Sequence, residues 1–244
     1  MIVEGPEDQR RLELLLPPDE IPELILLGGG AAGVEAGCRV LETGFQGAFI
    51  GVRDRDLMDE EKAQALSLEV PSLFVLPSRC LENELLHPPL LTHVLDMLGH
   101  QDMTEDVVRA VLREIADEQK AEVAVDLAEL DLYAKFELSR ERDQKDTPAE
   151  AMARRFRAKR DLGGEHISQL WGCVAGAEAA LEKRWEREHL NLMDGKKALH
   201  IVAQRAATGV RAQILEKALI RHALDDPPPG VARLRDAMRQ RASP

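Results

Sequence analysis

Ala48-Phe-Ile-Gly-Val-Arg-Asp-Arg-Asp56 is a short apolar run followed by two aspartates, Asp54 and Asp56, one residue apart. The apolar part, residues 47–51, predicts a buried strand. In a parallel sheet, side chains that follow a strand line the crevice at the carboxyl ends of the strands. The stretch therefore predicts a parallel sheet that presents carboxylates at this edge.

The surrounding sequence repeats the same pattern. Further strands are expected at 1–4, 22–27 and 72–76, with helices near 6–16, 31–43 and 58–66 between them. Strand and helix in alternation predict an α/β fold with a parallel sheet. From Thr104 to about Ser139, and again near 173–190, 195–203 and 208–224, the spacing is helical. We expect a small parallel α/β domain flanked by helices over residues 1–100 and a mainly α-helical extension over 101–244, with 190–203 returning to the first domain.

Composition narrows the functional classes. The chain has 244 residues, with 32 basic against 44 acidic side chains and a net charge of −12. This balance argues against a general nucleic-acid coat, because such coats bind phosphates through Lys and Arg. Three widely spaced cysteines favour a reducing compartment. No signal peptide and no apolar run of about 20 residues is evident, so we expect a cytoplasmic protein that does not bind a membrane.

Carboxylates follow three of the expected strands. Glu4 ends the first, Asp54 and Asp56 end the third, and Glu82 comes shortly after the fourth. Each alone has an ordinary explanation as a surface charge or as an acid in the first turn of a helix. Their joint placement favours a metal site at one edge of the sheet. Ligation by oxygen alone suits Mg²⁺ or Mn²⁺ and not zinc.

A glycine motif supports a competing interpretation. Gly28-Gly-Gly-Ala-Ala-Gly33 follows an apolar run and opens a helix, as in dinucleotide-binding folds. The motif lies on the second strand, however, and Tyr133 has Glu137 four residues later where a short-chain dehydrogenase needs a lysine. An oxidoreductase that binds NAD or FAD in a Rossmann-like fold remains an alternative. Otherwise the glycines form a tight turn, with amides that could face a phosphate.

The order of these acidic motifs resembles the Toprim domain of the OLD-type (overcoming lysogenization defect) nucleases and of the related DUF4435 proteins. Val3-Glu-Gly5 is similar to the strand-end glutamate of that family, and Asp54 with Asp56 to its Asp-x-Asp motif. Glu82-Asn83 is similar to a segment that follows the fourth strand. Asp194-Gly-Lys196 is similar to a later Gly-Lys segment. The resemblance covers residues 1–90 well and 190–203 more thinly.

The resemblance implies a Mg²⁺-dependent endonuclease that cleaves the phosphodiester bonds of DNA or tRNA, as an effector in antiphage defence. Glu4, Asp54, Asp56 and Glu82 would hold the metal, and Lys196 would stabilise the leaving or bridging phosphate. Lys196 could instead be a solvated lysine at a helix start. OLD proteins carry an ATPase domain ahead of Toprim, so an ABC-type ATPase would here be a separate partner. The middle residue of the Asp-x-Asp motif is Arg55 in this chain. Its side chain would contact a phosphate or weaken metal binding.

One dense basic run stands apart from the acidic motifs. It consists of Arg154, Arg155, Arg157, Lys159 and Arg160. The run either lines a nucleic-acid groove, because phosphate contacts position a substrate without reading its sequence, or forms a solvated helix face. A protein of this charge would gain from a partner or from a homo-oligomer for capturing a polyanion. A non-catalytic regulatory or assembly subunit is the remaining alternative.

Overall fold

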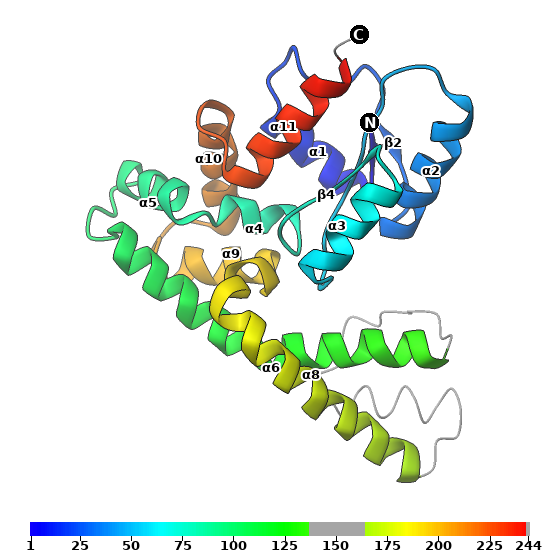
Figure 1. Cartoon of the computed structure of the whole chain (residues 1–244). Coiled ribbons are helices and arrows are strands. Elements are labelled where there is room, and N and C mark those ends of the chain that lie inside the picture. Colours follow the sequence, from blue (N-terminus) through cyan, green and yellow to red (C-terminus); the bar gives the residue numbers. More distant parts are fainter. Residues whose placement is uncertain (137–163, 243–244) are drawn as a thin grey trace. The chain divides into compact units, whose positions relative to one another are not determined.

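The computed structural model of the chain describes residues 1–136 and 164–242. Its N-terminal part holds a four-stranded parallel sheet in the order β2-β1-β3-β4 (Figure 1). The strands are β1 (Ile2–Val3), β2 (Leu26–Leu27), β3 (Gly51–Arg53) and β4 (Leu73–Val75). Strands β1, β2 and β4 lie within the predicted runs, whereas β3 starts at Gly51, the last residue of the run predicted at 47–51. The predicted fold class, a small parallel sheet with alternating helices followed by a mainly helical region, is confirmed.

Three helices connect the strands: α1 (Pro6–Leu15), α2 (Ala31–Gly44) and α3 (Glu60–Glu69). Right-handed crossovers place α1 on one face of the sheet and α2 and α3 on the other (Figure 1). The core under α2 and α3 is formed by Ile2, Val34, Cys38, Val70 and Leu73. Burying an aliphatic side chain of this size stabilises the fold by about 1.5–3 kcal/mol.

Close packing of α2 explains one glycine in the third strand. A Cβ atom at Gly51 would lie 2.2 Å from Cys38 Sγ, nearer than two atoms can approach. Only glycine therefore lets α2 lie this close to β3.

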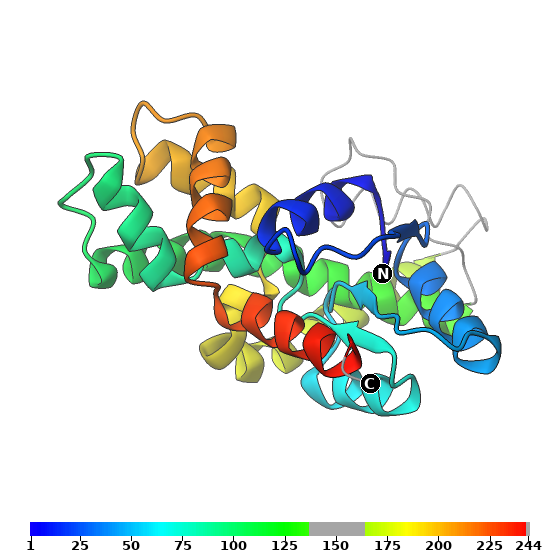
Figure 2. The same cartoon turned by 90° about the horizontal axis from the view of Figure 1, so that it is seen from above.

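The helices of the remaining described chain are α4 (Leu81–Leu85), α5 (Pro88–Met97), α6 (Glu105–Phe136), α8 (Gly164–Leu192), α9 (Gly195–Arg205), α10 (Ala212–Asp225) and α11 (Pro229–Ala242). Side-chain caps mark some of their starts: Asp194, for example, accepts a hydrogen bond from the Lys197 amide at 3.0 Å at the start of α9. Helix α10 packs against α1 and α5, as Figure 2 shows.

The chain forms two compact units. One comprises Met1–Ile115 and Asp194–Pro244, and the other Ala116–Met193. The helices from Asp194 onward thus belong to the same unit as the sheet. In the second unit Trp185 is buried, and its Nε1 donates to Asp117 Oδ1 at 2.6 Å. Lys120 forms an ion pair with Glu182 at 2.5 Å across the same helix pair.

The predicted basic run, Arg154, Arg155, Arg157, Lys159 and Arg160, lies outside the described residues. Within residues 1–136 and 164–242, no helix combines the length and the apolar character that a membrane span needs.

Candidate functional site

The sheet order creates a switch point between its two central strands. The connection from β1 leads to β2 on one side, and the next connection crosses back to β3 on the other side of β1. In open α/β sheets, ligands bind at the carboxyl ends of the strands where the order reverses in this way. Glu4 follows β1 and Asp54 follows β3. The two predicted carboxylates therefore flank the position where this fold class places its ligands.

Glu4 and Asp54 are in direct contact across this switch point. The Asp54 backbone amide donates to Glu4 Oε1 at 2.8 Å. The pKa of the Asp54 carboxyl is raised from its ordinary value of 3.8 to about 9, and burial is the main cause. The negative charges of four other carboxylates contribute to the same shift: Glu4, Asp8, Asp56 and Glu82. All four predicted ligands thus belong to one electrostatic cluster, and Asp8 is a further member of it.

The pKa of Glu4 is also raised. Burial is the main cause, and the charges of Asp56 and Asp8 contribute, whereas the hydrogen bond from the Asp54 amide and the charge of Arg53 lower it. The fold therefore disfavours the ionised forms of Glu4 and Asp54, so that a proton or a cation is needed to offset their charge.

The loop that contains Asp54 and Asp56 is hydrogen-bonded to the loop that follows β4. The amide of Arg55 donates to Ser78 O at 3.2 Å, and the amide of Asp56 donates to Arg79 O at 3.1 Å. Asp56 has a φ of 53°, a left-handed conformation that aspartate adopts more readily than most residues. Its half-exposed carboxylate lies 3.8 Å from Arg53 Nη2. The Arg55 side chain is buried within the fold.

A divalent cation fits this cluster in charge and in ligand chemistry. Buried carboxylates repel one another unless a cation neutralises them, and Mg²⁺ and Mn²⁺ prefer oxygen ligands. The carboxylates do not yet form a complete metal site, however. Among the described residues, no three Asp, Glu, His or Cys side chains are grouped so that they could hold a metal ion together. Metal binding would therefore require these carboxylates to turn toward a common point.

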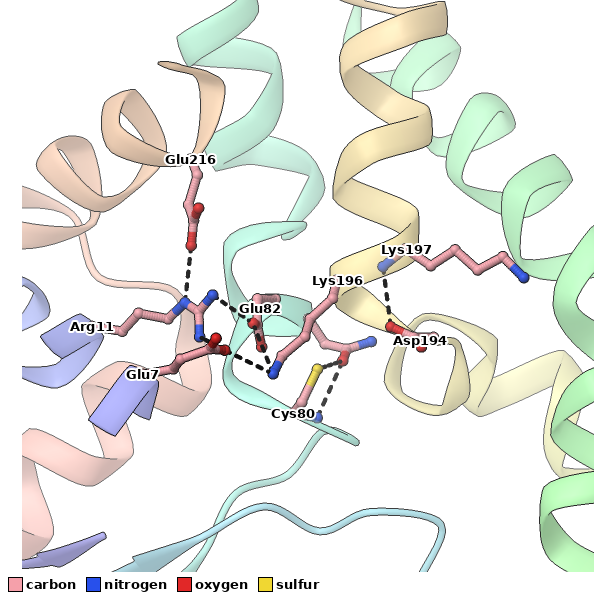
Figure 3. Close-up of polar contacts among 9 residues, drawn as sticks. Glu7, Arg11, Cys80, Glu82, Asp194, Lys196, Lys197 and Glu216 are labelled. Carbon is pink, nitrogen blue, oxygen red and sulfur yellow. Dashed lines mark hydrogen bonds and ion pairs between the residues drawn. The ribbon is translucent and has the colours of Figure 1, made fainter. Parts of the chain in front are cut away.

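Glu82 lies on α4 and faces two cations (Figure 3). Its Oε1 is 2.9 Å from Arg11 Nη2 and 3.8 Å from Lys196 Nζ. Lys196 also forms an ion pair with Glu7 at 3.2 Å, and Arg11 forms one with Glu216 at 2.9 Å. The structure thus brings the predicted Lys196 to the predicted Glu82. We call this group, Glu7, Arg11, Glu82, Lys196 and Glu216, the ion-pair cluster.

A glycine and an asparagine position Lys196. A Cβ atom at Gly195 would lie 2.6 Å from Asn83 Oδ1 and 2.7 Å from the Asn83 amide, so only glycine lets α9 start this close to α4. Asn83 in turn accepts a hydrogen bond from the Cys80 amide at 3.2 Å and shapes the start of α4. The predicted Gly-Lys and Glu-Asn segments therefore pack against each other.

Sequence reasoning missed several members of the site. Asp8 could have been recognised from the sequence, because it lies four residues after Glu4, in the first turn of α1. Arg11 and Glu216 could not, since α1 and α10 meet only in the folded chain. Cys80 was also missed: its thiol donates to Asn83 Oδ1 at 2.9 Å, and burial beside Glu82 raises its pKa well above the ordinary value.

The glycine motif, Gly28–Gly33, forms hydrogen bonds with the backbone of Glu4. The amides of Gly29 and Gly30 donate to the Glu4 carbonyl at 3.1 and 3.0 Å. Gly33 packs so closely that a Cβ atom there would lie 1.8 Å from Gly28 O. The motif also follows β2, the edge strand, and not a strand at the switch point. Two of its amides are therefore used to hold the residue that carries the Glu4 carboxylate.

Comparison with known proteins adds no family assignment: no family model, curated protein or solved structure matches the chain. The four-stranded parallel sheet with its flanking helices is consistent with a Toprim-like α/β fold.

Proposed function

We propose that this chain is a metal-dependent nuclease that uses Mg²⁺ or Mn²⁺ to hydrolyse phosphodiester bonds in DNA or tRNA. The observation that carries the proposal is the cluster of carboxylates at the switch point of the sheet, within which the pKa of Asp54 rises to about 9. Carboxyls whose ionised forms are disfavoured in this way are typical of sites that bind cations.

Glu4, Asp54 and Asp56 would hold the cation, with Glu82 completing or orienting the site. When bound, a divalent cation supplies Lewis acidity toward the phosphate and lowers the pKa of water. The overall reaction adds the oxygen of one water to phosphorus and breaks one P–O ester bond. The two protons of that water end on the departing alcohol and in solution or on the phosphate.

Lys196 would contact a phosphate oxygen as negative charge develops. It is half-exposed and starts α9, and its ammonium group lies at the rim of the ion-pair cluster. A positioned cation of this kind stabilises the transition state of phosphoryl transfer. By resemblance to the OLD-type nucleases, we propose a role in antiphage defence under the control of an ABC-type ATPase supplied as a separate chain.

The test is cleavage of supercoiled plasmid DNA and of total tRNA with Mg²⁺, Mn²⁺ or EDTA, alone and together with any ABC-type ATPase encoded beside the gene for this chain. Glu4→Gln and Asp54→Asn should each lower the rate about 100-fold or more, because metal ions contribute several kcal/mol to such reactions. Glu13→Gln, an exposed carboxylate on α1, is the matched control and should cleave like the wild type. Full activity of the Glu4 and Asp54 variants would exclude the proposed site.

One observation favours a second candidate. A non-catalytic regulatory or assembly subunit would also lack, among the described residues, a group of three side chains placed to hold a metal ion. Calorimetric titration with Mn²⁺ separates the two functions, since a non-catalytic subunit would neither bind the metal at this cluster nor cleave either nucleic acid in any of the mixtures above.

A further inference from the structure

Glu82 is the most buried member of the ion-pair cluster. Its side chain is 1% exposed, and both of its cationic neighbours reach it from other helices, Arg11 from α1 and Lys196 from α9. A buried carboxylate of this kind needs a positive partner, because its desolvation is otherwise uncompensated. Two cations therefore compete for a single acceptor.

The two cations are not equivalent. Arg11 is only 16% exposed and lies 2.9 Å from Glu82 Oε1, whereas Lys196 is 55% exposed and lies 3.8 Å from the same oxygen. Figure 3 shows the Arg11 guanidinium lying between Glu216 and Glu82, with Lys196 approaching from the opposite helix. The planar guanidinium can bind several carboxylates at once, which an ammonium group on a flexible chain does less well.

Arg11 is also held on its other sides. Its Nε forms an ion pair with Glu216 on α10 at 2.9 Å, and its Nη1 lies 3.5 Å from Glu7 one turn earlier on α1. Lys196, by contrast, forms its second ion pair with the exposed Glu7, at 3.2 Å. The guanidinium is therefore anchored, and the ammonium group is the one able to move.

We propose that Arg11 is a positioning residue: it neutralises Glu82 and thereby leaves the Lys196 ammonium group at the rim of the site, free to meet a phosphate. This inference rests on the proposed function for the role of Lys196, but the positioning itself depends only on the ion-pair cluster. Without Arg11, Lys196 is the remaining cation for Glu82, and the ammonium group is drawn inward, away from a bound phosphate.

Labelling of lysines tests the positioning without any cleavage assay. The full chain is treated briefly with formaldehyde and a borohydride reagent, and methylation at Lys196 is measured by mass spectrometry relative to Lys197, its exposed neighbour. Arg11→Gln should lower the labelling of Lys196 severalfold. Arg11→Lys, which keeps a cation for Glu82, should retain most of the wild-type labelling of Lys196. Arg10→Gln, on an exposed position of the same helix, is the matched control and should label like the wild type.

A double variant keeps the test valid if Arg11→Gln does not fold. Glu82→Gln removes the buried charge, so replacing Arg11 in that background should change the labelling of Lys196 far less than in the wild type. Unchanged labelling in folded Arg11→Gln would overturn the proposal. An equally large change with and without Glu82 would overturn it as well, because Arg11 would then not act through Glu82.

Cleavage assays add the functional readout. With an active wild type, Arg11→Gln should lower kcat and kcat/KM together, as expected when a contact to the transition state is lost. A rise in KM alone would instead indicate a role in substrate binding and would contradict the proposal. A wild type that cleaves neither DNA nor tRNA removes the proposed function, while the labelling result still decides whether Arg11 positions Lys196.

Discussion

The Asp54 amide donates to the Glu4 carboxylate at 2.8 Å and so joins the ends of β1 and β3, 50 residues apart in the sequence. The bond holds two acidic residues at the switch point of the sheet, because it joins the backbone of Asp54 to the side chain of Glu4. Each then lies within the electrostatic reach of the other and of Asp8. The acidity of this cluster has measurable consequences.

The free energy of unfolding, measured without divalent cations, should fall as pH rises. Asp54 has an ordinary pKa of 3.8 and a folded-state pKa of about 9. Below about pH 4 both folded and unfolded chains carry the proton; between these values only the unfolded chain releases it, which favours unfolding. The full stabilising effect is therefore present below the lower value and is lost as pH approaches the higher one. Glu4, with a raised pKa, shifts stability in the same direction.

Urea unfolding at pH 5 and pH 8 in EDTA measures this effect. The free energy of unfolding of the wild type should fall relative to that of Asp54→Asn by at most about 4 kcal/mol, at ~1.4 kcal/mol per pH unit. Mg²⁺ at pH 8 should stabilise the wild type more than the variant. The same pH dependence in both proteins would show that Asp54 is not the group responsible.

The start of α11 should be intolerant of a side chain at Gly230. The Gly230 amide donates to Glu84 Oε2 at 3.0 Å, and a Cβ atom there would lie 2.3 Å from the Glu84 carboxyl carbon. We expect Gly230→Ala to destabilise the fold by about 1–3 kcal/mol, as overpacking does. Gly176→Ala, in α8 with open space around it, is the control and should be neutral or stabilising by up to about 1 kcal/mol. Thermal unfolding of both variants decides between the two effects.

NAD and FAD should not stabilise the protein. The amides of Gly29 and Gly30 are bonded to the Glu4 carbonyl, and β2 lies at the edge of the sheet. A ligand that binds only the folded state raises the melting temperature by mass action, so a thermal shift assay is sufficient. We expect no shift with either dinucleotide. A clear rise at micromolar NAD or FAD would favour the Rossmann-like oxidoreductase over the nuclease.

The edge strand should take part in association. Leu24, Leu26 and Leu27 are exposed on or next to β2, whose outer edge has no neighbouring strand within residues 1–136 and 164–242. Exposed apolar edges of this kind favour pairing with another chain. We expect the wild type to self-associate or to bind the proposed ABC-type ATPase. Light scattering after size exclusion should show that Leu27→Lys weakens this association. A wild type that stays monomeric and ignores the ATPase would contradict the prediction.

Much of the sheet could be recognised from local pattern. Short apolar runs followed by an acid, a glycine or a proline predicted all four strands. Helical spacing predicted the helices between them, because burial of one face imposes a period on the sequence. The short helix α4 was less evident. Its five residues are all buried, including Glu82, Asn83 and Glu84, so it has no amphipathic period to detect.

The chemical identity of the candidate site was visible in the chain as Glu4, Asp54, Asp56, Glu82 and Lys196, because strand ends and glycine turns are local features. Which of these residues meet, and through which partners, depended on tertiary packing. Arg11 and Glu216 come together only where α1 packs on α10, and Lys196 reaches Glu82 only because Gly195 lets α9 approach Asn83. Contacts between distant segments leave no periodic trace in the sequence, since each depends on the shapes of two surfaces. For that reason the pairing of Glu82 with two cations emerged only from the folded structure.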